Sequence, residues 1–497
     1  MTVVGSEDTS DPSPDGADLA RLVRAGFGWS LVNSLAGRLV TILVGLALAR
    51  ILVPKEFGTF AVAFLVLAIV QSMNELGVSV AVLRWPGDAS RVARTAATLA
   101  IFMSVLLYLG VIVAAPVIAS AVRTPGAVSV IRILGIGIVI DGITSIPGAM
   151  MARQFMQKRR AIADIAGLIP TSALSIVLAL CGFGALSLVW GSLAGNAVSA
   201  VLILVLSPSR PMPGWHREDA GALLRIGLPL AGTSLALIAT LNVDYIVVGR
   251  TLGTVALGYY LLAFNLSSWP VNLLSVAVRR VAIAGFSRVN DDADALVAAF
   301  RRSLATLSAM AFLAAVLLAT LAEPLIEVAY GTIWEPAAAA LEMLAVLGGL
   351  RVAYDLIYDL LAAVGLSRRL LVVQLAWLAG LVIALPLGAR LGGIRGVGIA
   401  HCIVALTVVG PLYLAALVRL GISLRVVGAA LLAPAIAVTV SATIILIGRR
   451  AGWAPAVEVL VLGPAGALSF LAVVGLAPDH RPIVSRLIAA RRARRIL

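Results

Sequence analysis

The sequence predicts an all-α protein that crosses a membrane about fourteen times. Hydrophobic residues make up 61% of the 497 positions and charged residues only 12%. Apolar runs of spanning length recur along the chain, and basic residues gather in alternate gaps between those runs. A soluble domain is about half apolar and about a quarter charged. This chain carries too much apolar surface for a globular core, so a bilayer is its expected solvent.

A spanning helix needs roughly 20 apolar residues. Runs of this kind predict helices at 27–49, 58–82, 95–117, 129–150, 162–181, 185–206, 226–248, 257–278, 303–321, 339–362, 371–388, 396–418, 428–447 and 456–476. Two pairs of runs are separated only by short glycine-containing segments, Cys181–Gly184 and Gly388–Gly393. Each undivided pair is too long for one span, so these glycines predict turns.

The basic residues set the expected orientation. With the N-terminus inside, the inner segments hold most of the 38 Lys and Arg residues, which predicts cytoplasmic N- and C-termini. The same bias explains the net charge of +14 without nucleic acid. The longest outer loop, EPLIEVAYGTIWEP (323–336), carries glutamates and no basic residue. Tryptophans at or near the predicted spans are expected to be interfacial anchors: Trp190, Trp269, Trp334 and Trp453.

A sequence repeat relates the two halves of the chain. At an offset of 200 positions, RILVPKEFGTFAVAF (50–64) aligns with RTLGTVALGYYLLAF (250–264), which pairs Arg50 with Arg250 and Gly58 with Gly258. The repeat contains an even number of predicted helices, so we expect two parallel lobes that rock about a central cavity. The predicted parts are a disordered cytoplasmic tail (1–20), an N-lobe (21–206), a cytoplasmic linker (207–222), a C-lobe (223–420), a final helix pair (421–478) and a basic cytoplasmic tail (479–497).

Three segments resemble a known family: FGWSLVNSLAGRLVTILVGLALARILVPKEFGTFAVAF (27–64), NELGVSVAVLR (74–84) and GFGALSLVWGSLAGNAVSAVLILVLSPSRP (182–211). They resemble the Wzx-type polysaccharide-transporter flippases of the MOP superfamily. The resemblance implies movement of undecaprenyl-pyrophosphate-linked oligosaccharide from the inner to the outer leaflet of the cytoplasmic membrane, for lipopolysaccharide or exopolysaccharide biosynthesis. The superfamily also contains lipid II flippases and MATE-like small-molecule or cation antiporters. The antiporters usually lack the final helix pair, so the predicted helix count favours the lipid-linked sugar branch.

Charged side chains inside the predicted spans are functional candidates, because each costs about 2.5–3.5 kcal/mol on insertion scales. Arg38, near the middle of the first span, is expected to anchor an anion, since a guanidinium binds pyrophosphate bidentately. Arg351 is a second candidate, although Asp355 on the same helix face offers a neutralising pair. The expected cavity lining also includes Arg132, which can instead snorkel outward, together with Asn33 and Tyr354.

Carboxylates and the span ends supply the remaining candidates. The acids Asp141, Asp244, Asp355 and Asp359 are expected to bind a coupling ion, H⁺ or Na⁺, or to serve as counter-ions for the arginines. The expected gates are Glu75, Asn74, Arg279, Arg280, Arg50 and Arg250. Salt bridges or hydrogen bonds that fix helix packing are the alternative at each position. His401 is expected to be a packing residue.

The sequence contains no P-loop, G-x-S-x-G or zinc-ligand pattern, so we expect no cofactor and a gradient-driven or downhill process. Cys181 and Cys402 form no disulfide framework. A membrane-embedded glycan polymerase or ligase would need catalytic groups on a substantial outer loop, which the predicted topology lacks. The prediction is therefore a non-enzymatic transporter. Its expected partners are the bilayer, a lipid-linked oligosaccharide and other polysaccharide-assembly membrane proteins.

Overall fold

The computed structural model describes residue 37 and residues 40–74, 78–85, 88–207, 213–288 and 293–477. All the regular secondary structure in these residues is helical. Ten of the described segments are helical, long and apolar enough to cross a membrane. One of them, Arg368–Arg419, is long enough for two of the predicted spans. The protein is therefore an all-α, multi-pass membrane protein, and the count of fourteen spans stays a prediction.

The chain forms two compact units. Unit 1 consists of residues 1–48, 67–113 and 132–235, and unit 2 of residues 49–66, 114–131 and 236–497. Unit 1 contains α3 (Val78–Arg84), α6 (Ile136–Arg153), α7 (Gln157–Leu180) and α8 (Ala185–Leu206). Unit 2 contains α10 (Thr254–Arg288), α11 (Ala293–Thr320), α12 (Ala322–Tyr330), α13 (Ala338–Ala363), α14 (Ser367–Val404), α15 (Gly410–Arg419), α16 (Leu424–Arg449) and α17 (Pro455–Leu476). The unit boundaries divide α2 (Pro54–Asn74), α4 (Ser90–Ala121), α5 (Ala127–Leu134) and α9 (Arg217–Leu252).

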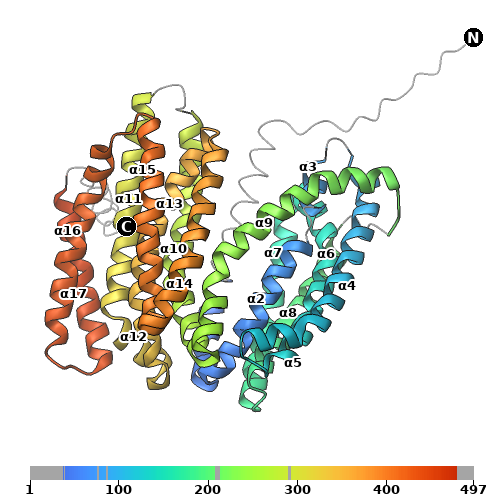
Figure 1. Cartoon of the computed structure of the whole chain (residues 1–497), viewed down its shortest axis with the longest axis horizontal. Coiled ribbons are helices and arrows are strands. Elements are labelled where there is room, and N and C mark those ends of the chain that lie inside the picture. The colour runs from blue at the N-terminus through green and yellow to red at the C-terminus, as the bar shows by residue number, and fades with distance from the viewer. Residues whose placement is uncertain are drawn as a thin grey trace, which may run out of the picture. The chain divides into compact units, whose positions relative to one another are not determined.

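In unit 1, small residues bring α7 and α8 into close contact, and the two helices lie side by side (Figure 1). A Cβ at Gly191 would lie 2.7 Å from the carbonyl oxygen of Thr171, so the two backbones almost touch. Close approach through small residues is a common way for membrane helices to associate. The predicted turn between these helices is confirmed: α7 ends at Leu180, α8 begins at Ala185, and Gly182 has a φ of +82°.

In unit 2, α13 is the central helix and packs against α10, α11 and α14 (Figure 1). The turn predicted inside 388–393 is also present, because Gly393 leaves the helical conformation with a φ of +58° within α14. Between α14 and α15, Ala405–Val409 form one turn of π-helix. Helices α16 and α17 pack on each other, and α16 packs on α11.

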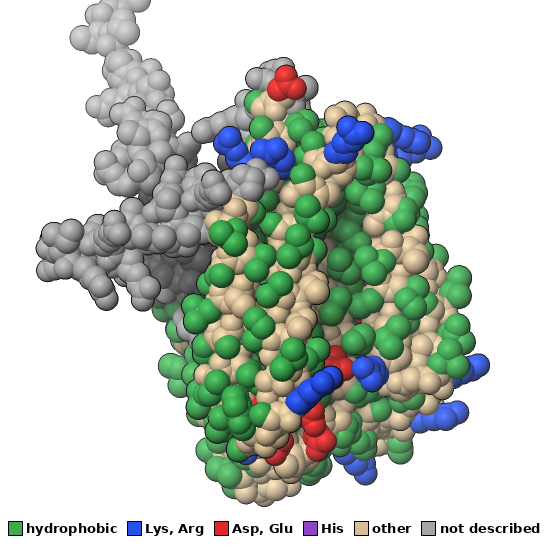
Figure 2. Space-filling model, turned by 90° about the vertical axis from the view of Figure 1, so that its left-hand side faces the viewer, with side chains coloured by type: hydrophobic (Ala, Val, Ile, Leu, Met, Phe, Trp, Pro, Cys, Tyr) green, Lys and Arg blue, Asp and Glu red, His purple; other side chains and the backbone are tan. Residues whose placement is uncertain are grey.

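One face of the molecule has the surface expected next to lipid. Figure 2 shows basic side chains near two opposite ends of this face, with acidic side chains beside them, and a band without charge between the two ends. Exposed leucine and isoleucine side chains cover α16 and α17, among them Leu432, Ile436, Leu460 and Leu468. An uncharged band bordered by basic residues is typical of a surface that lies in a bilayer.

Residues 323–336, predicted to form an outer loop, are mostly helical and well packed. They form most of α12 and of a 3₁₀ helix, Thr332–Ala337. Trp334 is fully buried and donates a hydrogen bond from Nε1 to the carbonyl oxygen of Ala49, 2.7 Å away. The prediction of an interfacial anchor is wrong for Trp334, because its ring packs edge-on against Phe57 and Tyr259 inside unit 2.

The two repeat sequences meet at a crossing of α2 and α10 in unit 2. A Cβ at Gly58 would collide with the carbonyl oxygen of Thr254, and a Cβ at Gly258 would collide with that of Pro54. The contact is reciprocal, because each glycine faces the first residue of the other helix and both pairs are 200 positions apart. This reciprocity is what parallel repeats related by a two-fold axis produce.

Other segments predicted to lie on the outer side come together beside this crossing. The hydroxyl groups of Thr124 and Thr254 lie 2.7 Å apart and share a hydrogen bond. Arg50 donates hydrogen bonds to the carbonyl oxygens of Ala329 (2.9 Å) and Val328, at the end of α12. A cation at a helix C-terminus is favourable, because it meets the unpaired carbonyl groups. We call Arg50, Gly58, Thr124, Thr254 and Gly258 the crossing cluster.

Candidate functional site

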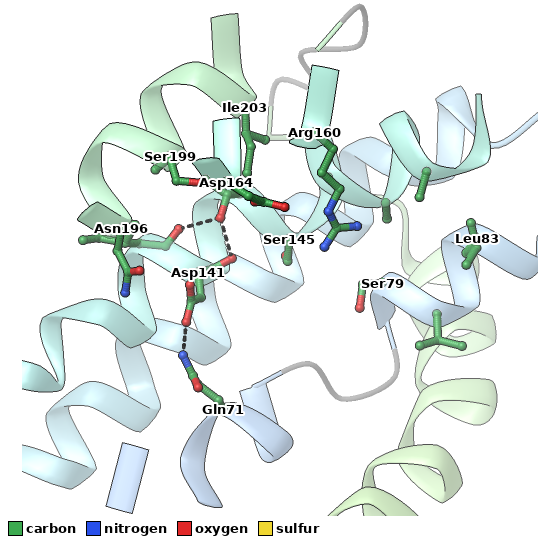
Figure 3. Close-up of a pocket in the computed structure, with 17 residues that line it drawn as sticks. Gln71, Ser79, Leu83, Asp141, Ser145, Arg160, Asp164, Asn196, Ser199 and Ile203 are labelled. Atoms are coloured by element: carbon green, nitrogen blue, oxygen red, sulfur yellow. Dashed lines mark hydrogen bonds between the residues drawn. The ribbon is translucent and has the colours of Figure 1, made fainter. Parts of the chain in front are cut away.

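A polar cavity of about 540 Å³ lies within unit 1 (Figure 3). Its walls come from the end of α2, from α3, and from α6, α7 and α8. Pockets that hold small ligands in proteins are about 300–1,000 Å³, so the cavity has the size of a ligand site. The polar lining residues are Gln71, Ser79, Asp141, Thr144, Ser145, Arg160, Asp164, Asn196 and Ser199.

Helical spacing places these side chains on one surface. On α6, Asp141, Thr144 and Ser145 are three and four residues apart, so they share a face. On α8, Asn196 and Ser199 follow the same spacing. Small residues along α6 leave the space open: a Cβ at Gly148 would meet no atom within 4 Å.

The lining is rich in hydrogen-bonding groups, and among its described residues the carboxylates outnumber the cations. Gln71 donates a hydrogen bond from Nε2 to Oδ2 of Asp141. Asp141 and Asp164 are both half-buried, whereas Arg160, a cation of the lining, is exposed. Figure 3 shows Arg160 and Asp164 directed toward the same hollow from α7. Hydroxyl, amide and carboxylate groups of this kind bind polar, uncharged or cationic ligands.

No group of His, Cys, Asp and Glu with the geometry of a metal site occurs in the part of the chain that the structure describes. The lining itself consists of hydroxyl, amide, carboxylate, guanidinium and aliphatic groups. The described lining can therefore bind a ligand through hydrogen bonds and electrostatic attraction.

A second polar cluster lies in unit 2 and is almost completely buried. Asp244, on α9, is 1% exposed. The hydroxyl of Tyr260 donates to Oδ2 of Asp244 at 2.9 Å, and the backbone N–H of Tyr245 donates to Oδ1 at 2.9 Å. His401 Nε2 lies 3.6 Å from Asp244 Oδ2. His401 is thus more than an apolar packing residue, because it faces a buried carboxylate.

The predicted residues of α13 lie beside this buried cluster or farther along the helix. Arg351 is half-buried and interacts electrostatically with the hydroxyl groups of Tyr245 and Tyr260. Tyr354 is buried and donates a hydrogen bond to the carbonyl oxygen of Ala405, 2.8 Å away, where the π-helix begins. Asp355 is half-buried and Asp359 is 7% exposed.

Three other arginines predicted for the cavity or the gates lie at the surface: Arg132, Arg50 and Arg250. Arg132 is exposed and donates from Nε to the carbonyl oxygen of Ile112 at 3.2 Å. Arg50 is exposed and holds the end of α12, and Arg250 is exposed at the end of α9. Arg38, Asn33 and Glu75 lie outside the described residues, as do the side chains of Asn74, Arg279 and Arg280. The roles proposed for all these residues stay predictions.

Among the predicted site residues that the structure describes, Asp141 alone lines the unit 1 cavity. Sequence reasoning missed Gln71, Asp164 and Asn196, and it assigned Arg160 to the general basic bias of the inner segments. One signal was available: Arg160 and Asp164 are four residues apart at the start of α7, and therefore share a helix face. Oppositely charged residues on one face of a mainly apolar helix indicate contact with water.

Comparison with known proteins gives matches over most of the chain. Residues 47–339 match the family model described as polysaccharide biosynthesis protein. The lipopolysaccharide biosynthesis protein WzxC of Escherichia coli (strain K12) is 25% identical over 353 residues, which cover 68% of this chain and 69% of WzxC. The succinoglycan biosynthesis transport protein ExoT of Rhizobium meliloti (strain 1021) is 26% identical over 403 residues, 79% of each chain.

The fold is similar to that of a solved flippase. The structure of the lipid II flippase MurJ in an inward closed conformation superposes with a TM-score of 0.77 at 14% identity, covering 92% of this chain and 100% of that one. At this level of identity the likeness concerns the fold alone. It agrees with the all-α multi-pass architecture described above.

Proposed function

The chain belongs to the polysaccharide biosynthesis protein family, and from this premise we propose that it is a flippase for lipid-linked oligosaccharide. The observation that carries the proposal is the polar cavity of about 540 Å³ inside a helical unit of a membrane protein. Polar groups in a bilayer are costly unless they line a water-filled space or pair with one another. A hollow of this kind suits the polar headgroup, while the polyprenyl tail stays in lipid.

The names of the similar proteins support the substrate class. WzxC and ExoT are named for lipopolysaccharide and succinoglycan biosynthesis, and MurJ for lipid II. Each name concerns a polysaccharide or a lipid-linked glycan. We therefore propose a polyprenyl-pyrophosphate-linked oligosaccharide, used for cell-surface polysaccharide biosynthesis, as the cargo, and we propose transport without catalysis.

Alternating access is the proposed mechanism. In the crossing cluster, α2 and α10 are in reciprocal backbone contact. We propose that this contact is on the outer side and that it separates when the headgroup is released. The parallel repeat supports this, because two similar halves can rock about the axis that relates them.

The charged residues predicted from the sequence have roles within this proposal. Arg38 and Arg351 are proposed to hold the pyrophosphate, through the bidentate geometry of a guanidinium. Asp141 and Asp244 are proposed to couple transport to H⁺ or Na⁺. The buried contact between Asp244 and His401, 3.6 Å apart, supports a coupling role for this carboxylate in unit 2.

The proposed location is the cytoplasmic membrane, with both termini inside and with contacts to other polysaccharide-assembly membrane proteins. The distribution of Lys and Arg supports this orientation. The loops that the topology assigns to the outer side meet at the crossing cluster, which also supports it.

Leaflet exchange in proteoliposomes tests the proposal. The purified protein is reconstituted with a fluorescent polyprenyl-pyrophosphate oligosaccharide, and an impermeant quencher reports how much reaches the opposite leaflet. We expect exchange with wild type, and slower exchange with Arg38→Ala than with the charge-retaining Arg38→Lys. Efflux of small organic cations without any glycan exchange would instead identify an antiporter.

A further inference from the structure

We propose that the unit 1 cavity binds the glycan of the cargo rather than its pyrophosphate, and that it selects neutral or amino sugars over acidic sugars. This inference rests on the proposed function and deepens it by assigning one part of the substrate to one cavity. The assignment follows from three properties of the lining: its charge, its hydrogen-bonding groups and its open space.

The charge of the lining opposes an anion. Asp141 and Asp164 are half-buried in the wall, where solvent screens them less than at the surface. The opposing cation, Arg160, is exposed and therefore well screened. Clefts lined by one sign of charge concentrate ligands of the opposite sign by about 10–1,000-fold. The predominance of carboxylates among the described lining residues acts in the same direction. The same field repels a pyrophosphate or a uronic acid and attracts an ammonium group.

The hydrogen-bonding groups match sugar hydroxyls. The hydroxyls of Ser79 and Ser199 and the amide of Asn196 can both donate and accept. Thr144 and Ser145 donate to backbone carbonyl oxygens of α6, and their hydroxyl oxygens can still accept. Asp141 and Asp164 accept hydrogen bonds, which a sugar hydroxyl or ammonium group donates and a phosphate oxygen cannot. The lining is thus complementary to a donor-rich ligand.

The open space is sufficient for such a ligand. A Cβ at Gly148 would meet nothing within 4 Å, so this part of α6 borders a void. With about 540 Å³ available, the cavity is within the range that holds small ligands.

Thiol reactivity measures the charge selectivity directly. In Ser199→Cys, a thiol replaces a hydroxyl of the lining, and the exposed native Cys181 serves as the reference within the same molecule. The protein in lipid nanodiscs is treated with a cationic or an anionic methanethiosulfonate, and peptide mass spectrometry gives both rates. We expect the cation-to-anion rate ratio at position 199 to exceed that at Cys181 by about tenfold.

The ratio should depend on the two carboxylates. Asp141→Asn with Asp164→Asn keeps the shape and polarity of the lining and should bring the ratio at position 199 to within about threefold of that at Cys181. Asp88→Asn is the matched control, because Asp88 is an exposed carboxylate outside the cavity and should leave the ratio unchanged. The charge assignment is overturned if the cation-to-anion rate ratio at position 199 equals the ratio at Cys181. It is also overturned if the anionic reagent reacts faster than the cationic reagent at position 199.

Protection of the same thiol tests the ligand. The probes are chitin oligosaccharides (neutral), chitosan oligosaccharides (cationic), oligogalacturonate (anionic) and inorganic pyrophosphate. Slower modification with either of the first two, and not with the last two, supports the proposal. Protection by pyrophosphate or oligogalacturonate overturns the selectivity, and no protection by any probe overturns the glycan assignment.

Leaflet exchange separates this inference from the proposed function. If wild type exchanges lipid-linked glycan but the thiol shows no charge preference, only the inference fails. If wild type exchanges none, the proposed function fails, whatever the thiol shows.

Discussion

A glycine in unit 1 and a pair of glycines in unit 2 have opposite surroundings. A Cβ at Gly58 or Gly258 would collide with a backbone carbonyl oxygen, whereas a Cβ at Gly148 would meet nothing within 4 Å. The carboxylates differ in the same way. Asp244 is 1% exposed and has Tyr260 and His401 around it, while Asp141 is half-buried beside a cavity. Small residues in a membrane protein thus serve two purposes: they allow close helix contact, as at Gly58 and Gly258, or they border an open hollow, as at Gly148.

The largest expected effect on stability comes from the buried cluster of unit 2. Asp244→Ala leaves the Tyr260 hydroxyl without its acceptor and His401 without a facing carboxylate. Each buried hydrogen-bonding group that is left without its partner costs about 1–3 kcal/mol, and a charged one costs more. Asp141→Asn should cost less than about 1 kcal/mol, because the amide oxygen still accepts from Gln71. Unfolding in mixed detergent micelles measures the change in the free energy of unfolding for each variant. Equal decreases for the two variants would contradict the different roles given to the two carboxylates.

Glycine substitutions should give the next largest effect. Gly58→Val forces the α2–α10 crossing apart, and overpacking of this kind costs about 1–3 kcal/mol. Gly148→Val adds the same side chain beside the cavity and should change thermal stability little, while it slows leaflet exchange. The account is contradicted if Gly148→Val destabilises the protein as much as Gly58→Val does.

Arg50 and Arg250 occupy equivalent repeat positions but differ in their contacts. Arg50 donates to carbonyl oxygens at the end of α12, and the described residues provide no comparable contact for the exposed Arg250. Arg50→Gln should therefore lower stability by about 1 kcal/mol, and Arg250→Gln by less. The two melting temperatures, measured side by side in detergent, check this difference.

These comparisons show how far the sequence could predict the structure. The turns at Gly182 and Gly393 were predictable, because glycine residues interrupted runs too long for one span. The repeat was predictable from matched Arg and Gly residues, and its reciprocal contact at Gly58 and Gly258 needed coordinates. The burial of Trp334 was not predictable, since position near a span end is equally typical of an interfacial anchor.

The candidate site was less predictable than the fold. The contact between Asp244 and His401 joins helices far apart in the chain, and hydropathy carries no information on which spans are neighbours. The unit 1 cavity likewise combines side chains from separate helices, of which only Asp141 stood out as a charge in mid-span. Asp164 did not stand out as a site residue in the sequence, because it closely follows the basic residues at the start of α7.

The smallest expected effect concerns Asp88, at the start of α4. The hydroxyl and then the backbone N–H of Ser90 donate to this carboxylate and lower the pKa of Asp88 below its usual value. A lowered pKa stabilises the folded state at neutral pH, and this contribution disappears as the pH falls through the pKa of the folded protein. The difference in melting temperature between wild type and Asp88→Asn should shrink toward acid pH. A difference independent of pH would show that ionisation of Asp88 plays no part.

A reversible cross-link at the crossing cluster tests alternating access most directly. The hydroxyl oxygens of Thr124 and Thr254 are 2.7 Å apart. Cysteine sulfurs in the positions of these oxygens would need only a small shift to reach the S–S bond length of roughly 2.0 Å. Thr124→Cys with Thr254→Cys, in a chain that also carries Cys181→Ser and Cys402→Ser, is oxidised in proteoliposomes and assayed for leaflet exchange of lipid-linked oligosaccharide. Each single cysteine variant is the control. We predict that oxidation stops exchange and that reduction restores it; undiminished exchange by the fully cross-linked protein would contradict the account.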